Sequence, residues 1–209
     1  MKFFLRFNLL NLYYNSPQIY LFHLSVPPFG KWKQRTDTKV LSECSKIPFP
    51  IKTILDVGCG PGDFSSKIHK VFPKSTLLGI DTSKEMIGFA RKNYTDPGIN
   101  FAEKELYDIS GSFDLIISSG TWNYMDFEDS IQKAKSMLNT PGMLLISTYA
   151  PAFFSKIHWT LINLFSTIKQ APLKTIAEYQ TCMEEHGMTV QYFVTNSWEK
   201  GFFIIGLLP

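Results

Sequence analysis

The chain has 209 residues, of which 44% are hydrophobic and 19% are charged, and its formal net charge is +3. This length suits one domain with a sizeable core, and the composition is ordinary for a soluble globular protein. The small net charge, without a run of consecutive Lys or Arg, argues against nucleic acid as a partner. Three widely spaced cysteines argue against a disulfide framework and a cysteine-based metal site, and they favour a cytoplasmic setting.

The first 50 residues are expected to form an N-terminal extension. Residues 1–24 hold Lys2 and Arg6 among many Phe, Leu and Tyr residues. Asparagines interrupt every apolar run of about 18 residues and no small-residue cleavage site follows, so neither a membrane span nor a signal peptide is predicted. The extension either packs on the domain or adds non-native residues from a misassigned start. The functional alternatives are a lid over the active site and a peripheral contact with a membrane.

Strand-like and helix-like segments alternate from residue 51 onward, which is typical of a parallel sheet with helices on both faces. Strands are expected near residues 52–57, 75–80, 99–103, 113–118 and 142–149, and helices near residues 62–72, 83–94, 127–138 and 173–187. Two further strand-like runs, 188–194 and 201–208, are joined by a linker too short for a parallel crossover, so they predict a hairpin with one antiparallel strand. The expected fold is α/β, with a Rossmann-like doubly wound sheet of about seven mostly parallel strands.

The glycine-rich segment 54–62 is the most informative part of the chain. A short apolar run ends in Asp56, and glycines follow at every second position, at Gly58, Gly60 and Gly62. This pattern predicts a buried strand that ends in a tight loop, where glycine lets the backbone turn sharply and a ligand approach closely. Ligands of open parallel sheets bind at the carboxyl end of such strands. The dinucleotide fingerprint G-x-G-x-x-G is not met, because Asp63 stands where its third glycine would fall.

A second apolar run, residues 76–81, ends in Asp81. A carboxylate at this point can accept hydrogen bonds from both ribose hydroxyls of an adenosine, a feature that NAD-binding folds share. Ser83 is expected to cap the helix that follows, and Met86 lies one turn into that helix.

The pattern Asp-x-Gly-x-Gly-x-Gly resembles motif I of the class I S-adenosylmethionine-dependent methyltransferases. Four further segments follow in the order and at the spacing of that family, namely 76–81, 99–103, 113–120 and 138–147. The last of them resembles the family's helix end, Pro-Gly turn and fifth strand. The resemblance implies that residues 51–209 form a methyltransferase domain. It also implies S-adenosylmethionine as cofactor and a small-molecule acceptor, with methyl transfer achieved mainly by proximity and alignment of the two.

The resemblance also implies which residues contact the cofactor. They are Asp56, Gly58, Cys59, Gly60, Gly62, Asp81, Thr82, Met86, Glu103, Lys104 and Ser119. In the family, an apolar residue at the place of Met86 packs against the adenine, and an acid at the place of Glu103 accepts from its amino group. Glu105 is the competing choice for that acid. Some members grip the cofactor carboxylate with a basic or aromatic residue upstream of motif I, and Arg35 is assigned on that ground.

Few catalytic side chains are expected, because the donor carries its own leaving group. A base for an oxygen or nitrogen acceptor would be Tyr124 or His158. Trp122 is expected either as a wall near the sulfonium or in the core, and Asn123 as a hydrogen-bond partner of the acceptor. The insertion 150–173, which includes Trp159, has an apolar helical face that either packs on the core or favours an apolar, lipid-like acceptor.

No metal site is predicted. Of the remaining histidines, His69 is expected on the outer face of its helix and His186 at a helix C-terminus. Two alternative functions stay open, a catalytically silent methyltransferase-like binding or regulatory domain and an NAD-dependent oxidoreductase.

Overall fold

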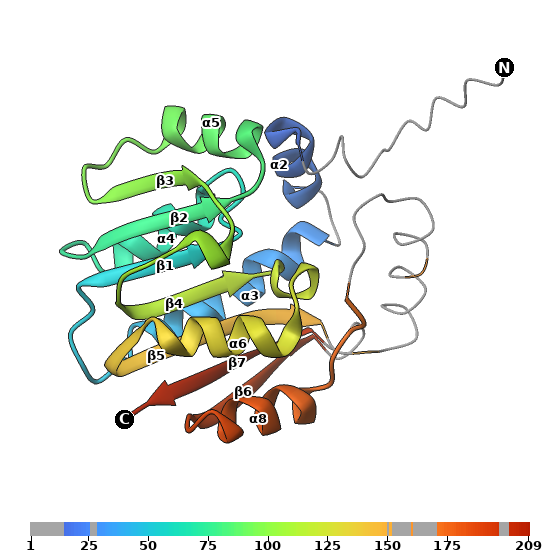
Figure 1. The fold of residues 1–209 in the computed structure, drawn as a ribbon. Helices are drawn as coiled ribbons and strands as arrows, with labels where there is room; N and C mark the ends of the chain where they lie inside the picture. The colour runs from blue at the N-terminus through green and yellow to red at the C-terminus, as the bar shows by residue number, and fades with distance from the viewer. Residues whose placement is uncertain (1–14, 26–28, 150, 152–159, 161–170, 197–200) are drawn as a thin grey trace, which may run out of the picture.

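The computed structural model describes residues 15–25, 29–149, 151, 160, 171–196 and 201–209. A seven-stranded sheet in the order β3-β2-β1-β4-β5-β7-β6 forms its centre (Figure 1). Its strands are β1 (Thr53–Val57), β2 (Thr76–Asp81), β3 (Ile99–Glu103), β4 (Phe113–Ser119), β5 (Leu138–Tyr149), β6 (Thr189–Asn196) and β7 (Gly201–Leu208). Strands β1 to β5 are parallel, whereas β7 runs antiparallel to both β5 and β6. The expected mixed sheet and its C-terminal hairpin are confirmed.

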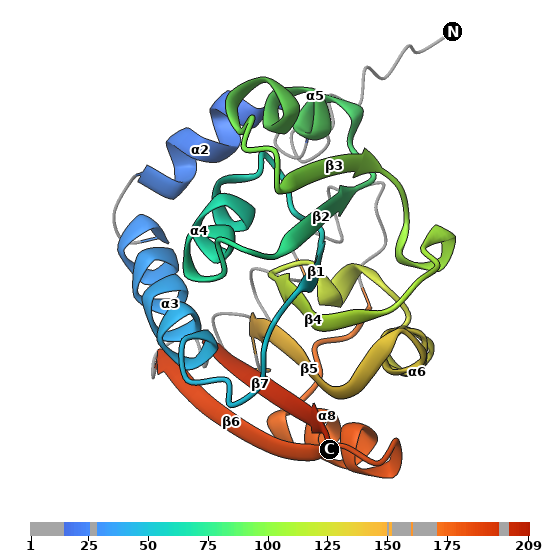
Figure 2. The same cartoon turned by 90° about the vertical axis from the view of Figure 1, so that its left-hand side faces the viewer.

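Helices cover both faces of the sheet (Figure 2). The helical elements are α2 (Pro17–Ser25), α3 (Phe29–Cys44), α4 (Asp63–Val71), α5 (Lys84–Asn93), η1 (Leu106–Asp108), η2 (Trp122–Tyr124), α6 (Phe127–Ser136) and α8 (Ile176–Glu185). Side-chain caps begin several of them, and the cap at Ser83 is the one that the sequence predicts. The Ser83 hydroxyl accepts from the Met86 N–H at 3.3 Å, and Thr175 and Glu178 form a reciprocal capping box.

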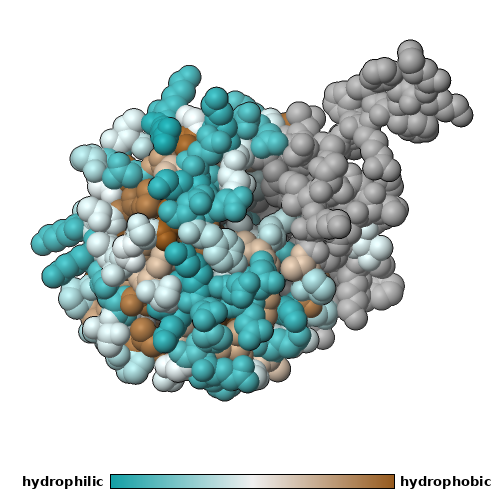
Figure 3. Space-filling view, viewed as in Figure 1, coloured by the Kyte–Doolittle hydropathy of each residue, from teal (hydrophilic) through white to brown (hydrophobic). Residues whose placement is uncertain are grey.

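The sheet separates two apolar layers. Helices α3, α4 and α5 pack on one face through residues such as Val40, Ile68 and Ile87. Helices α6 and α8 pack on the other through residues such as Ile131 and Met183. The outer surface of this second layer is mostly hydrophilic (Figure 3), as burial of one face of each amphipathic helix requires. The sheet is therefore the central layer, and loops lie at its amino edge and its carboxyl edge, where the parallel strands begin and end.

Two local expectations are corrected. The Pro-Gly turn lies inside β5 and does not precede it. Phe113 pairs with Leu138 and Leu115 pairs with Met143, so residues 139–142 form a bulge in the pairing of β4 with β5. His69 is buried rather than on an outer face, with its Nε2 3.1 Å from the Ser75 carbonyl oxygen. The turn after α4 folds back over the imidazole, which a helical-face argument does not foresee.

None of the helices in the described parts of the chain has the length and apolar character needed to span a bilayer.

Candidate cofactor and acceptor site

The glycine loop joins β1 to α4 at the carboxyl edge of the sheet. The φ angles of Gly58, Gly60 and Gly62 are 72°, 55° and 88°, in the region that favours glycine. The N–H groups of Gly58 and Cys59 both donate to the Ile80 carbonyl, at 2.8 and 2.9 Å, which fixes the loop against the end of β2.

Two glycines of this loop have different surroundings. A Cβ on Gly58 would lie 2.0 Å from the Thr121 hydroxyl oxygen, because the loop that follows β4 packs against the backbone there. A Cβ on Gly60 would meet nothing within 4 Å. One glycine is therefore required by protein packing, whereas the other leaves open space beside the backbone for a ligand.

Asp81 ends β2 beside this loop. Its carboxylate accepts the Gly60 N–H at 3.0 Å through Oδ2 and the Ser83 N–H at 2.9 Å through Oδ1. Burial raises the pKa of Asp81, and these N–H donors oppose the increase. The Thr82 N–H acts in the same direction on this pKa. A carboxylate has about four acceptor positions, so acceptor capacity remains for a ligand. Glu103 is the register partner of Asp81 on β3, which brings the two acids to one edge.

Asp56 is the last residue but one of β1 and is only 1% exposed. Its Oδ2 accepts the Ser65 hydroxyl at 2.5 Å. Burial raises the pKa of Asp56 to about 7, against the lowering effects of Ser65 and of the Lys33 ammonium. This carboxyl group would gain from a further cationic partner, because its single side-chain donor does not compensate its desolvation.

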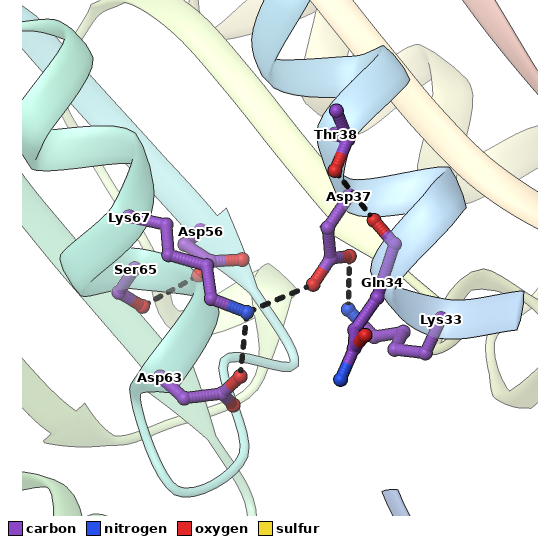
Figure 4. A network of polar contacts seen from close by, with 8 residues as sticks. All are labelled: Lys33, Gln34, Asp37, Thr38, Asp56, Asp63, Ser65 and Lys67. Atoms are coloured by element: carbon purple, nitrogen blue, oxygen red, sulfur yellow. Dashed lines mark hydrogen bonds and ion pairs between the residues drawn. The ribbon is translucent and has the colours of Figure 1, made fainter. Parts of the chain in front are cut away.

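Helix α3 closes over the start of α4 through an ion-pair network (Figure 4). The Asp37 carboxylate lies 2.5 Å from the Lys33 Nζ and 3.1 Å from the Lys67 Nζ. The Lys67 Nζ also lies 3.4 Å from Asp63, the first residue of α4. The Lys33 Nζ stands 4.6 Å from the ring centroid of Phe64. The network ties the N-terminal extension to the helix that follows the glycine loop.

Two basic residues of α3 differ in their surroundings. Arg35, the predicted residue, is exposed on α3. Lys33 lies on the inner side of the same helix, where it contributes to the electrostatics of Asp56. The sequence reasoning missed Lys33 and Asp37, although a signal existed. Both precede the buried Val40 at helical spacing and therefore belong to its face.

The loop after β4 is anchored by buried polar contacts. The Asn123 amide donates to the Thr148 hydroxyl at 2.6 Å, and the Tyr179 hydroxyl donates to the Asn123 Oδ1 at 3.5 Å. The Asn123 carbonyl accepts the Ala171 N–H at 3.0 Å. Trp122 is 1% exposed within the layer of α6 and α8. This placement favours the core-packing alternative for Trp122 over a wall near the sulfonium, because apolar neighbours enclose the side chain.

The other predicted residues divide by exposure. Thr82, Glu103 and Lys104 are exposed at the carboxyl edge, and the Lys104 N–H donates to the Asp81 carbonyl at 3.1 Å. The remaining predicted residues are buried or half-buried, namely Cys59, Met86, Ser119 and Tyr124. His158 and Trp159 lie outside the described residues. Within the described parts of the chain, no group of three or more His, Cys, Asp or Glu residues is placed to hold a metal ion.

The doubly wound sheet, the glycine loop, the acid near the end of β1 and the acid that ends β2 are typical of a Rossmann-like protein with a nucleoside-cofactor site. The chain belongs to the methyltransferase domain family, which matches residues 50–195. The resemblance to the class I S-adenosylmethionine-dependent methyltransferases is thereby confirmed as a family membership. The family assignment does not support the NAD-dependent alternative.

Two curated relatives illustrate the similarity of this chain to named proteins. The malonyl-(acyl-carrier protein) O-methyltransferase of Anoxybacillus flavithermus is 33% identical over 119 residues, which cover 54% of this chain and 45% of that protein. The malonyl-(acyl-carrier protein) O-methyltransferase 1 of Ilyobacter polytropus is 32% identical over 155 residues, which cover 72% of this chain and 56% of that protein. The chain spans about half the length of the curated relatives it matches.

The fold is shared with solved methyltransferase structures. Magnesium protoporphyrin IX methyltransferase from Synechocystis PCC 6803, with bound SAH, has a TM-score of 0.75 at 16% sequence identity. The similarity covers 96% of this chain and 98% of that one. At this identity the likeness establishes the fold.

Proposed function

We propose that this protein transfers the methyl group of S-adenosylmethionine to an oxygen atom of a small-molecule acceptor with an acyl or otherwise apolar portion. The observation that carries the proposal is the Asp81 carboxylate beside the open side of Gly60. The names of the curated relatives support an oxygen acceptor on an acyl compound. In this proposal residues 51–209 form the catalytic domain and residues 1–50 an extension. The cytoplasmic setting stays a prediction.

The site fits the nucleoside part of the cofactor. The free acceptor positions of Asp81 suit two ribose hydroxyls, and the open space beside Gly60 admits a ligand against the backbone. Glu103, placed next to Asp81 by the strand register, would accept from the adenine amino group. Met86 and Thr82 follow Asp81 and would bound the adenine.

The site also fits the amino-acid part of the cofactor, which carries an ammonium and a carboxylate. We assign Asp56 to the ammonium of the cofactor's amino-acid part, because the buried carboxyl group lacks a full cationic partner. We assign Lys33 to its carboxylate, because Lys33 lies on the inner face of α3 and Asp37 holds it there. Arg35 stays a prediction, and its exposure makes it the weaker candidate.

When bound, S-adenosylmethionine supplies an electrophilic methyl group on a sulfonium. The chain then has to bind the donor and the acceptor, align them and exclude water, and it does not have to activate the donor. A carboxylate acceptor is already a nucleophile and requires no base. A hydroxyl acceptor would require one, for which Tyr124 and His158 stay the predicted residues.

Calorimetric titration of the wild-type protein with S-adenosylmethionine and, separately, with NADH tests the cofactor. We expect S-adenosylmethionine alone to bind, and Asp81→Ala to weaken binding by roughly tenfold to a hundredfold, because hydrogen bonds to a charged group are lost. Glu184→Ala, an exposed acid on α8, is the control and should bind normally. Binding of NADH, or equal loss in both variants, would contradict the assignment.

Methyl transfer is tested with malonyl-N-acetylcysteamine as acceptor and mass spectrometry of the product. We expect a methyl ester and S-adenosylhomocysteine in equal amounts. Cofactor binding without any product, from this and a broad panel of acyl and hydroxyl acceptors, would instead favour the catalytically silent alternative.

A further inference from the structure

Helix α3 brings a cation near a buried acid without pairing the two. The Lys33 Nζ lies 2.5 Å from the Oδ1 atom of Asp37, four residues further along the same helix, and 4.6 Å from the ring centroid of Phe64. Among the hydrogen bonds of the described residues, the buried Asp56 carboxyl group takes part only in the one from the Ser65 hydroxyl. Figure 4 shows Asp56 close to the ion-pair network but joined to Ser65 alone.

Asp37 is the residue that holds Lys33 on α3. A buried ammonium and a buried carboxylate each require an ionic partner, and the side chains of Lys33 and Asp37 are only 13% and 4% exposed. The Lys67 Nζ lies 3.1 Å from the other carboxylate oxygen of Asp37 and so favours its ionised form. We infer that Asp37 is a positioning residue of the cofactor site, which retains Lys33 on α3 and thereby keeps the Asp56 carboxyl group available to the ammonium of the cofactor.

The surroundings of Asp56 show what this retention achieves. Burial raises the pKa of Asp56 to about 7, and the Ser65 hydrogen bond and the Lys33 charge oppose the increase. The charges of Asp63 and Asp81 raise the pKa further. A cation in direct contact would therefore stabilise the ionised carboxylate. If Lys33 itself made that contact, it would fill the place that the proposed function gives to the ammonium of the cofactor.

Helix α3 lies outside residues 50–195, which the methyltransferase domain family matches. With Asp37 in this role, α3 becomes part of the cofactor site. The C-terminal half of α3 packs in the apolar layer through the buried Val40 and Cys44, so the helix should stay in place when the charge of Asp37 is removed. The role of Asp37 deepens the proposed function and rests on it, because it assumes a cofactor with an ammonium group.

Calorimetric titration of the full chain with S-adenosylhomocysteine and with methylthioadenosine tests this role. The two ligands share a nucleoside and a thioether, but only the first has the amino-acid part. In Asp37→Asn, Lys33 loses its charged partner and should turn to Asp56, the buried acid that lacks a cation. We expect affinity for S-adenosylhomocysteine to fall by roughly tenfold or more, and affinity for methylthioadenosine to change by less than about twofold.

The pH dependence of stability is a second readout, which a merely structural role of Asp37 would not move. An ion pair with Lys33 would lower the pKa of Asp56 in the folded state. The fall in the free energy of unfolding between about pH 4 and about pH 7 should therefore be smaller in Asp37→Asn than in the wild type. Urea unfolding measures this difference, while Asp63 and Asp81 stay unchanged near Asp56 in both proteins.

Glu43→Gln is the matched control, because Glu43 forms an ion pair with Lys46 at 2.6 Å near the other end of the same helix. This variant should bind both ligands like the wild type. A double variant, Lys33→Met with Asp37→Asn, tests whether Asp37 acts through Lys33. Its affinity for S-adenosylhomocysteine should be no lower than that of Lys33→Met alone.

Three results would overturn the inference. They are an unchanged affinity for S-adenosylhomocysteine in Asp37→Asn, an equal loss of affinity for both ligands, and additive losses in the double variant. Asp81→Ala separates these results from a failure of the proposed function. If Asp81→Ala weakens binding and Asp37→Asn does not, the proposed function stands and only the role of Asp37 is wrong. A wild type that binds neither S-adenosylmethionine nor S-adenosylhomocysteine would overturn the proposed function itself.

Discussion

Two edges of the same sheet use aspartate in opposite ways. At the amino edge, Asp114 of β4 accepts the N–H groups of Lys52 and Thr53 at 2.7 and 2.9 Å and the Asn139 amide at 2.7 Å. At the carboxyl edge, Asp56 accepts one side-chain hydroxyl, and Asp81 retains free acceptor positions.

The pKa values follow this difference. Partial burial acts to raise the pKa of Asp114, but the hydrogen bonds from Asn139, Lys52 and Thr53 outweigh it and the pKa is lowered. Burial dominates at the carboxyl edge, where the pKa of Asp56 rises to about 7 and that of Asp81 also rises. A carboxylate that accepts several hydrogen bonds from the protein, like Asp114, has a structural role. A buried carboxylate with few such donors near the end of a strand is a candidate for ligand binding.

The largest expected effect is the pH dependence of stability at Asp56. Its folded pKa of about 7 lies above the ordinary value of an aspartate, so the protonated form is favoured in the folded state. The free energy of unfolding should therefore fall as pH rises from about 4 to about 7, by up to about 1.4 kcal/mol per pH unit. Urea unfolding across this range measures the slope.

Asp56→Asn is the matched variant, since its amide oxygen still accepts from Ser65. It should flatten the slope, and an unchanged slope would contradict the raised pKa. Binding of a cationic ligand should release a proton near pH 6, which calorimetry in two buffers of different ionisation enthalpy detects.

The next effect concerns the amino edge. Asp114→Ala should lower the free energy of unfolding by about 2–3 kcal/mol, because two backbone N–H groups and the Asn139 amide lose a charged acceptor. Affinity for S-adenosylmethionine, measured by calorimetry, should stay within about twofold. A large loss of affinity at unchanged stability would reverse the assigned roles of the two edges.

Asp81→Ala is the complementary change at the carboxyl edge. It should weaken cofactor binding by at least about tenfold, which corresponds to about 1.4 kcal/mol. The free energy of unfolding should fall less than in Asp114→Ala, because the cost of burying the Asp81 carboxylate, which raises its pKa, offsets part of what its Gly60 and Ser83 N–H donors contribute. Thermal melting without ligand and calorimetry with S-adenosylmethionine measure the two quantities in the same preparation. Equal losses of stability and affinity would show that Asp81 has a structural role like that of Asp114.

The smallest effect is expected for the ion pairs that tie α3 to α4. Lys67 is 41% exposed on its side chain, so Lys67→Met should lower the free energy of unfolding by at most about 1 kcal/mol. Lys70→Met, an exposed lysine on the same helix, is the control. Asp37 keeps its contact with Lys33 in this variant, so a loss of cofactor affinity beyond about threefold would mean that Lys67 itself faces the cofactor.

The sequence alone determined the features that depend on neighbouring residues. A β-branched run ending in Asp56 and alternating glycines predicted the strand, the loop and the helix start, because each follows from the backbone preferences of a few adjacent residues. The short link 195–200 determined an antiparallel hairpin, since a parallel crossover needs more chain. The Ser83 cap was likewise visible in the sequence.

Only the tertiary structure decided contacts between segments far apart in the chain. It packed Lys33 against Asp37 and Phe64 and left Arg35 exposed. It also placed Thr121 against Gly58 and enclosed Trp122 within the layer of α6 and α8. Residue type and spacing leave these choices open, because several side chains of one helix or loop have similar local preferences. The packing of the whole domain selects among them, since only one arrangement buries the apolar face while the charged groups keep partners.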